Sequence, residues 1–202
     1  MDHTGAYDPN WVVARYDGQC EQEWERFSRS PVDEVSLFIH THYLREFVIP
    51  GSRVLDVGAG PGRFTQILAE MGCRIVATDI SPVQLELHRK YAEELDFDHA
   101  VEARLQIDVC EMSQLDQESF DAVVCYGGPL SYVFDRAPAA LQECVRVCRK
   151  SGILLASVMS LWGGAHRFLR GVLTVPPDSN RKITDTGDLT PSNWEGAEHH
   201  CH

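Results

Sequence analysis

The sequence lacks the features that mark secreted, membrane-spanning and nucleic-acid-binding proteins. No run approaches the roughly 18 apolar residues that a membrane-spanning helix needs, and the first residues contain no apolar signal segment. Basic residues are few, because 18 Lys and Arg stand against 30 Asp and Glu, for a formal net charge of -12. This charge repels a phosphate backbone and an anionic membrane surface alike. We therefore expect a soluble cytoplasmic protein that binds neither nucleic acid nor membrane.

Cysteines at metal-binding or redox spacing are missing as well. The 7 cysteines are an odd number, and no two of them form a C-x-x-C motif. Cys144 and Cys148 lie four positions apart within an apolar helical stripe, which is typical of small core residues. The histidine-rich residues 199–202 have no surrounding framework that would fix tetrahedral coordination. We expect no metal site.

What the sequence does contain is an alternation of short apolar runs with amphipathic segments. The apolar runs predict strands at 53–57, 74–79, 103–107, 120–126 and 153–159, and the segments between them predict helices at 31–48, 63–71, 82–91 and 138–149. The central runs are apolar throughout, as expected for strands that are covered on both faces. The predicted fold class is α/β, a doubly wound and mainly parallel sheet with helices on both faces.

The parts outside this core are harder to interpret. We expect residues 1–30 to form an aromatic lid or cap and residues 31–160 to form the binding core. Residues 162–173 could be helical, and 176–198 are predicted to be a polar loop, because Asp, Asn, Thr and Pro are frequent there. We expect residues 161–202 to belong to an incomplete substrate-side region.

A glycine-rich turn follows the first predicted strand, in the stretch VLDVGAGPGRFT at 54–65. Turns of this kind are shared by many nucleotide binders, and the strict G-x-G-x-x-G fingerprint fails here because Arg63 stands at the third glycine position. Asp56, just before the turn, would repel a pyrophosphate but attract a cation. Asp79 ends the second strand 19 positions after Gly60, where this architecture places the carboxylate that binds a ribose. The pattern favours a cationic adenosyl ligand over a dinucleotide.

Together these motifs resemble those of class I S-adenosylmethionine-dependent methyltransferases. The resemblance spans about 35–159 and includes FDAVVCY at 120–126 and the passage at 141–152, where Lys150-Ser151-Gly152 departs from the usual Pro-Gly-Gly turn. It implies S-adenosylmethionine as cofactor and S-adenosylhomocysteine as product. It also implies a set of cofactor-binding residues. These are Asp56, Gly58, Ala59, Gly60 and Phe64 around the turn, Asp79 at the ribose, Ile80, Asp108 and Val109 at the adenine, and Tyr126 beside the transferred methyl.

Each of these residues also has a structural alternative. Asp56 could be a capping or solvated carboxylate, Asp79 a strand-end turn residue, and Asp108 a helix N-cap. Tyr126 could contact substrate or close the core. Tyr16, in the aromatic N-terminal stretch, is expected to face the pocket, where an aromatic ring would stabilise a sulfonium.

The acceptor is expected to be a small molecule. The segment after the fourth strand, YGGPLSY at 126–132, lacks the Asn/Asp-Pro-Pro-Tyr-like motif of enzymes that methylate nucleobase amines. A general base is needed only for an acceptor that must lose a proton, and His40, His42, His166 and His200 are candidates that the sequence does not rank. Two alternatives stay open: an NAD-dependent oxidoreductase and a catalytically silent S-adenosylmethionine-binding protein.

The fifth predicted strand raises a question about the edge of the sheet. Related enzymes continue with a further helix and an antiparallel strand pair, and no such pattern follows residue 159. An apolar edge strand invites pairing with another chain. The expectation is either an incomplete domain or a homodimer that covers this edge.

Overall fold

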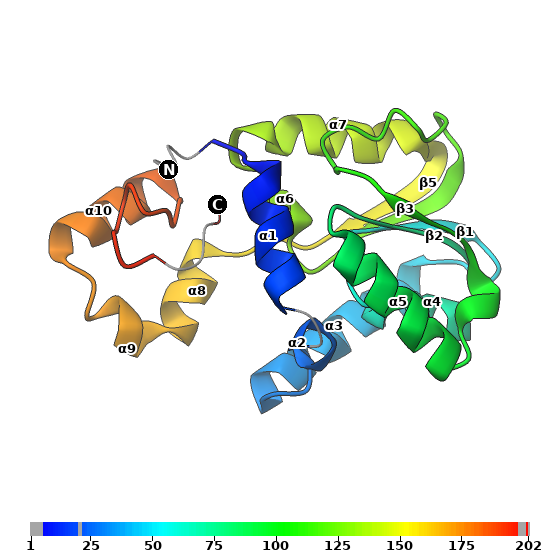
Figure 1. Cartoon of the computed structure of the whole chain (residues 1–202), viewed down its shortest axis with the longest axis horizontal. Helices are drawn as coiled ribbons and strands as arrows, with labels where there is room; N and C mark the ends of the chain where they lie inside the picture. The colour runs from blue at the N-terminus through cyan, green and yellow to red at the C-terminus, as the bar shows by residue number, and fades with distance from the viewer. Residues whose placement is uncertain (1–5, 20–21, 198–200, 202) are drawn as a thin grey trace.

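The computed structural model describes residues 6–19, 22–197 and 201. Its centre is a five-stranded, fully parallel sheet in the order β3-β2-β1-β4-β5 (Figure 1). The strands are β1 (Arg53–Val57), β2 (Arg74–Asp79), β3 (Val101–Gln106), β4 (Phe120–Cys125) and β5 (Cys148–Ala156). The order reverses between β1 and β4, which is where ligands bind in sheets of this kind. The predicted doubly wound α/β fold is confirmed.

Helices cover both faces of the sheet because the strands alternate their apolar side chains. Val54 and Val124 pack with α3 (Pro31–Phe47), α4 (Arg63–Glu70) and α5 (Pro82–Glu94) on one face. Leu55 and Val123 pack on the other face, with α7 (Ala137–Val147) and the β3–β4 connection. Side chains on both faces are fully buried, so the apolar runs are explained by a two-sided core.

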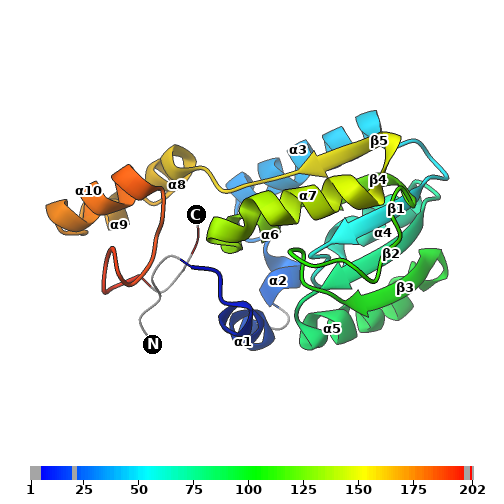
Figure 2. The same ribbon diagram turned by 90° about the horizontal axis from the view of Figure 1, so that it is seen from above.

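The remaining elements are short and lie outside the sheet. They are α1 (Pro9–Gln19), α2 (Gln22–Glu25), the 3-10 turns η1 (Asp98–Ala100) and η2 (Phe134–Arg136), α6 (Pro129–Tyr132), α8 (Leu161–Arg167), α9 (Leu169–Val172) and α10 (Pro177–Thr186). In both ribbon views α8, α9 and α10 lie to one side of the sheet, with α1 and α6 between them and the strands (Figure 2). Within the described residues, no helix combines the length and apolar character needed to cross a membrane.

Two predicted elements were wrong. The polar segment 176–198 contains α10, which begins with Pro177 in its first turn and ends at Gly187 in the left-handed conformation. The helix was not predicted because its residues are mostly polar. The proline at its start and the glycine after its end did indicate a helix. The second error concerns residues 148–152, which were predicted as a helix end and a turn. They belong to β5. The strand bulges between Cys148, which pairs with Phe120, and Ile153, which pairs with Ala122.

The fifth strand is an edge strand of the described sheet, as predicted. The outer face of α3 beside it is also apolar: Val35 is 57% exposed and Phe38 70%. The structure leaves this side of the molecule with uncovered apolar side chains.

Candidate functional site

The glycine-rich turn connects β1 to α4 and is fixed by its backbone angles. Gly58, Gly60 and Gly62 have φ values of 66°, 53° and 98°, in the left-handed region that favours glycine. A Cβ on Gly58 would lie 2.4 Å from Cγ of Pro129, the first residue of α6. Because Gly58 has no side chain, the turn can pack directly against Pro129 at the start of α6.

A cavity opens beside this turn at the carboxyl ends of β1, β2 and β4. Its empty space is about 840 Å³ when the open solvent at its mouth is included. Its wall is built from the N-terminal helices, the glycine turn and the loops after β2, β3 and β4. The lining residues are Tyr7, Val12, Tyr16, Glu23, Arg26, Phe27, Val57, Gly58, Ala59, Gly60, Pro61, Arg63, Phe64, Asp79, Ile80, Gln84, Ile107, Val109, Tyr126, Gly127, Pro129, Tyr132 and Val133.

Asp79 lies on this wall and holds two loops together. Its Oδ2 accepts from the backbone N–H of Gly60 at 2.9 Å, and its Oδ1 accepts from the N–H of Ser81 at 2.9 Å. The backbone N–H of Ile80 also interacts with this carboxylate, whose roughly four lone-pair sites leave room for a ligand donor. Burial raises the pKa of Asp79 to about 6 against the effect of these hydrogen bonds. The two hydrogen bonds thus hold the carboxylate in a fixed orientation on the cavity wall.

Asp56 occupies a different position from the one expected. It is 1% exposed and is not part of the cavity wall, because its side chain points into the interface between β1 and α4. Its Oδ2 accepts from the Thr65 hydroxyl at 2.6 Å. Burial raises the pKa of Asp56 to about 7, while the Thr65 hydrogen bond lowers it. Any influence of Asp56 on a ligand therefore acts through the turn and not by direct contact.

Asp108 is also absent from the wall, although its neighbour Val109 lines it. Oδ2 of Asp108 accepts from the Tyr7 hydroxyl at 2.9 Å, and Oδ1 accepts from the N–H of Cys110 at 2.8 Å. Burial and the negative charge of Asp108 raise the pKa of Tyr7 well above its usual range. The N-terminal segment therefore covers the carboxylate that the sequence assigns to adenine recognition.

The other sequence-predicted residues come together on one wall. Gly58, Ala59, Gly60 and Phe64 line it from the turn and α4, Ile80 from the loop after β2, Tyr126 from the end of β4 and Tyr16 from α1. Tyr16 and Tyr132 meet edge to face, with ring centroids 5.6 Å apart. Burial is the first cause of the raised pKa values of Tyr16, Tyr126 and Tyr132, so these phenols stay neutral at physiological pH.

Sequence reasoning did not single out three polar residues of the wall. Glu23 and Arg26 form an ion pair at 3.1 Å, and Arg26 donates to the carbonyl of Gly127 at 3.3 Å. Gln84 is 1% exposed, and its Oε1 has no hydrogen-bond partner although Nε2 donates to the Tyr16 carbonyl at 2.9 Å. The one available signal was the i, i+3 spacing of Glu23 and Arg26, which is common on solvated helices.

Of the four histidines named as possible bases, the three that the structure describes lie off the wall. The ring of His40 packs against Tyr126 at 4.6 Å, its Nδ1 donates to the Ser36 carbonyl at 2.7 Å, and burial lowers its pKa. His42 pairs with Glu46 on the surface of α3, and His166 is exposed. His200 lies outside the described residues. Within the described part of the chain, no cluster of His, Cys, Asp and Glu could hold a metal ion.

The methyltransferase domain family matches residues 54–152, which is about half of the chain and includes the glycine turn, Asp79 and Asp108. The chain belongs to the class I S-adenosylmethionine-dependent methyltransferases. The family is one of enzymes, and S-adenosylmethionine is its cofactor.

Two relatives with the same name are similar to this chain over part of their length. The ubiquinone biosynthesis O-methyltransferase of Alkalilimnicola ehrlichii is 28% identical over 151 residues, which cover 73% of this chain and 59% of that protein. Its counterpart in Xanthomonas campestris is 30% identical over 55% of this chain and 45% of that protein. The chain thus spans between about half and three fifths of these relatives.

Solved structures share the fold at low sequence identity. The cyclase SpnF superposes with a TM-score of 0.63 at 20% identity, covering 74% of this chain and 59% of that one. A phosphoethanolamine N-methyltransferase of Haemonchus contortus, crystallised with S-adenosylhomocysteine, gives 0.59 at 22% identity over 75% of this chain and 32% of that one. A methyltransferase-like protein of Methanococcus maripaludis gives 0.57 at 16% identity over 96% of this chain and 83% of that one. These matches show the fold alone.

Proposed function

We propose that this methyltransferase transfers the methyl group of S-adenosylmethionine to a small-molecule acceptor, with an oxygen atom as the first acceptor to test. The observation that carries this proposal is Asp79, a buried carboxylate that hydrogen-bonds the glycine turn and faces the same cavity as the turn. Oxygen comes first because the relatives in ubiquinone biosynthesis are named O-methyltransferases.

The residues present fit an adenosyl ligand. Gly58 and Gly60 line the cavity without side chains, so a ligand can approach the backbone of the turn closely. The unpartnered Oε1 of Gln84 and the spare lone pairs of Asp79 would accept hydrogen bonds from ribose hydroxyls. Ile80 and Val109 supply apolar walls for an adenine ring. Gln84 therefore joins Asp79 as a proposed ribose residue.

The cavity wall also offers charged groups for the amino-acid part of the cofactor. A methionyl group carries an ammonium and a carboxylate, and Glu23 with Arg26 offers the complementary pair of charges on the wall. We place the methionyl end there and the acceptor beside Tyr16, Tyr126 and Tyr132. The aromatic residues of 1–30 then act as a lid, while residues 161–202 remain a candidate substrate-side region.

Bound S-adenosylmethionine supplies an activated methyl group, so the protein needs neither a metal nor a covalent nucleophile for the transfer. The chain contributes alignment of the acceptor and exclusion of water. Tyr16 and Tyr132 line the site with neutral phenols, which can orient an acceptor oxygen by hydrogen bonding. No histidine of the described residues faces the cavity, so we expect an acceptor whose proton is acidic enough to leave without a dedicated base.

Calorimetry and turnover test this proposal in sequence. S-adenosylhomocysteine should bind, and NAD should not; the reverse result would favour the oxidoreductase alternative. Labelled S-adenosylmethionine is then incubated with a panel of catechols, phenols and amines. Transfer to a phenolic oxygen supports the proposal. Binding without any transfer would indicate a silent cofactor-binding protein or a different reaction on this fold.

A further inference from the structure

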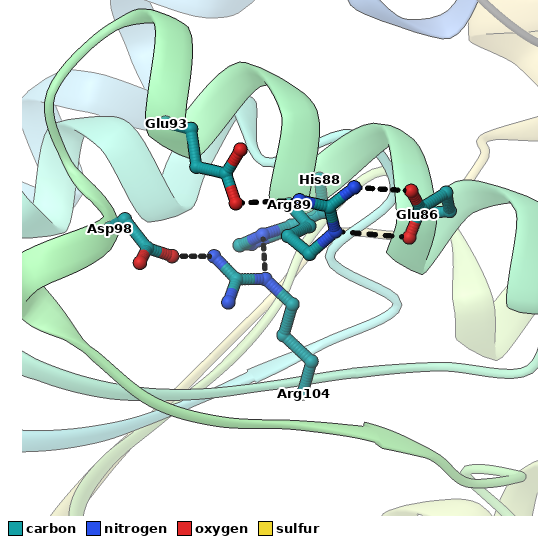
Figure 3. A network of polar contacts seen from close by, with 6 residues as sticks. All are labelled: Glu86, His88, Arg89, Glu93, Asp98 and Arg104. Carbon is teal, nitrogen blue, oxygen red and sulfur yellow. Dashed lines mark hydrogen bonds and ion pairs between the residues drawn. The ribbon is translucent and has the colours of Figure 1, made fainter.

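A chain of buried polar contacts runs from the surface to the back of the glycine turn. Arg104 on β3 pairs with Asp98 at 2.6 Å, and its Nε contacts Nδ1 of His88 on α5 at 2.9 Å (Figure 3). His88 is fully buried, and its Nε2 contacts Oγ1 of Thr65 at 2.9 Å. Thr65 in turn contacts Asp56. The contacts therefore link β3, α5, α4 and β1.

The direction of every hydrogen bond in this chain is fixed by chemistry. A guanidinium only donates, so Nδ1 of His88 must accept and Nε2 must carry the ring proton. Nε2 then donates to Thr65, whose single hydroxyl proton is left for Asp56. Burial and the positive charge of Arg104 lower the pKa of His88 to about 3, which keeps the ring in this neutral form. All the donors point toward the Asp56 carboxylate.

The chain ends directly behind the ligand cavity. A Cβ on Gly62, the last glycine of the turn, would lie 3.1 Å from Cδ2 and 3.2 Å from Nε2 of His88. Asp56 is two residues before Gly58, which lines the cavity from the other side of the turn. The relay and a ligand would thus contact opposite sides of the same short segment.

We propose that Arg104, His88 and Thr65 form a one-way hydrogen-bond relay that favours the ionised form of Asp56 behind the glycine turn, so that the cavity prefers cationic S-adenosylmethionine to the less positively charged S-adenosylhomocysteine. Hydrogen bonds to a carboxylate favour its charged form, and linked bonds in a buried site strengthen one another. The sulfonium gives the substrate one more positive charge than the product. A buried negative charge nearby therefore favours substrate entry and product release.

The pKa of Asp56 lies where a small shift changes the charge of the carboxylate at neutral pH. With a pKa of about 7, Asp56 is close to half ionised at neutral pH, and a change of one pKa unit takes it to about one tenth or nine tenths ionised. The negative charge of Asp79 on β2 raises the Asp56 pKa, and Asp56 in turn interacts electrostatically with the Cys125 thiol of β4. A hydrogen bond with Cys144 and burial raise the pKa of Cys125 far above neutrality, so the thiol stays uncharged. Only Asp56 and Asp79, with a pKa of about 6, titrate in this group between pH 5.5 and 8.

The first experiment needs no ligand and so is independent of the proposed function. The side-chain carboxyl carbons of aspartate are labelled with carbon-13, Asp56 is assigned with D56N, and its titration is followed by NMR. Thr65→Val should raise the Asp56 pKa by about one unit, because a hydrogen bond to the charged form is lost. Thr65→Ser keeps the hydroxyl and should leave the pKa in place.

The outer members of the relay provide the sharper test, since they do not touch Asp56. Arg104→Met should raise the Asp56 pKa by a smaller amount in the same direction, and His88→Gln, which retains a donor for Thr65, should largely preserve it. Arg89→Gln is the matched control, because Arg89 lies next to His88 on α5 but pairs with Glu86 and Glu93 on the surface. Should Thr65→Val fail to fold, Arg104→Met still decides: an unchanged Asp56 pKa in that variant would overturn the relay.

The ligand preference rests on the proposed function and is measured separately. The ratio of S-adenosylmethionine to S-adenosylhomocysteine affinity is determined by calorimetry from pH 5.5 to 7.5. The ratio should fall as the pH is lowered through the Asp56 pKa, and at pH 7 it should be severalfold lower in Thr65→Val than in Thr65→Ser. Equal ratios in the two variants would refute the selectivity. If neither ligand binds, the proposed function is refuted. The NMR titration of Asp56 would then still test the relay.

Discussion

The two strand-end aspartates show how far a single residue can be interpreted from sequence. Asp79 was predicted as a ribose ligand, and the structure places it on the cavity wall. Asp56 was predicted as a direct attractor of the cationic ligand, yet it faces Thr65 behind the turn. The spacing identified both carboxylates, but strand alternation and the identity of the facing helix residue decide where each one points. That partner, Thr65, is the last residue of the stretch at 54–65, but the sequence alone does not show that its hydroxyl donates to Asp56.

Replacement of Asp79 should mainly affect ligand binding. In Asp79→Asn one carboxylate oxygen becomes an amide nitrogen facing the N–H donors of Gly60 and Ser81, so the loop and the ribose contact are both disturbed. We expect at least about tenfold weaker S-adenosylhomocysteine binding, or roughly 1.4 kcal/mol or more, by calorimetry. Asp116→Asn, at an exposed position, is the control and should bind like the wild type.

A substitution at Gly58 can separate two effects on stability: the clash of a new Cβ with Pro129 and the strain of a positive φ. Gly58→Ala would suffer both a positive φ and a clash with Pro129, whereas Gly51→Ala has a positive φ of 82° but nothing within 4 Å of its Cβ. Strain alone costs about 1–2 kcal/mol, so urea unfolding should show that loss in both variants and a larger one at Gly58. Only Gly58→Ala should also lose S-adenosylhomocysteine binding. Equal stability losses would argue against the clash.

At the scale of elements, helix ends were predicted well where a residue caps the backbone. Ser81 before Pro82 predicted the start of α5, and the Ser81 Oγ accepts from the N–H of Gln84 at 3.1 Å. The same hydroxyl donates to Asp17 on α1 at 2.5 Å, a contact between distant segments that no local pattern contains. Caps are local and can be predicted, whereas the docking of α1 over the cavity depends on tertiary packing.

Removal of this cap should loosen α1 as well as α5. Ser81→Ala should lower the free energy of unfolding by about 1 kcal/mol, as is typical for loss of an N-cap. Ser30→Ala removes the corresponding cap of α3 and serves as the comparison. Limited trypsin digestion should cleave at Arg15 faster in Ser81→Ala only, since Ser30 does not contact α1. Equal cleavage rates would show that the Asp17 contact does not hold the helix.

At the scale of the whole molecule, the parallel sheet and its two-sided core followed from the alternation of apolar runs and helices, whereas the strand order was not predicted. The helix α10 did not, because its residues are mostly polar and none of them is buried. Nor did the relay through His88, whose four contributing elements are distant in sequence. Polar networks of this kind depend on which side chains the fold brings together. These contacts cannot be predicted from local patterns in one sequence.

His88 should leave a signature in the acid stability of the entire fold. Its pKa is about 3 in the folded chain and 6.5 when unperturbed, so between these values the unfolded chain binds about one more proton. The His88 contribution therefore destabilises the fold as the pH falls from 6.5 toward 3. Near pH 5 the unfolding free energy of the wild type should rise with pH about 1.4 kcal/mol per unit more steeply than that of His88→Gln. Urea titrations at pH 4.5, 5.0 and 5.5 measure this difference, and parallel slopes would contradict a neutral buried histidine.

The cavity wall is assembled from segments as far apart as Tyr7 and Val133, and this has a practical consequence. A molecule that fills the cavity would act as a non-covalent cross-link between loops that separate when the chain unfolds. At a concentration 100 times its dissociation constant it would add about 2.7 kcal/mol to stability. Thermal melting with S-adenosylhomocysteine present can therefore be used to screen acceptor libraries, because a true acceptor should raise the melting temperature further without any turnover being detected.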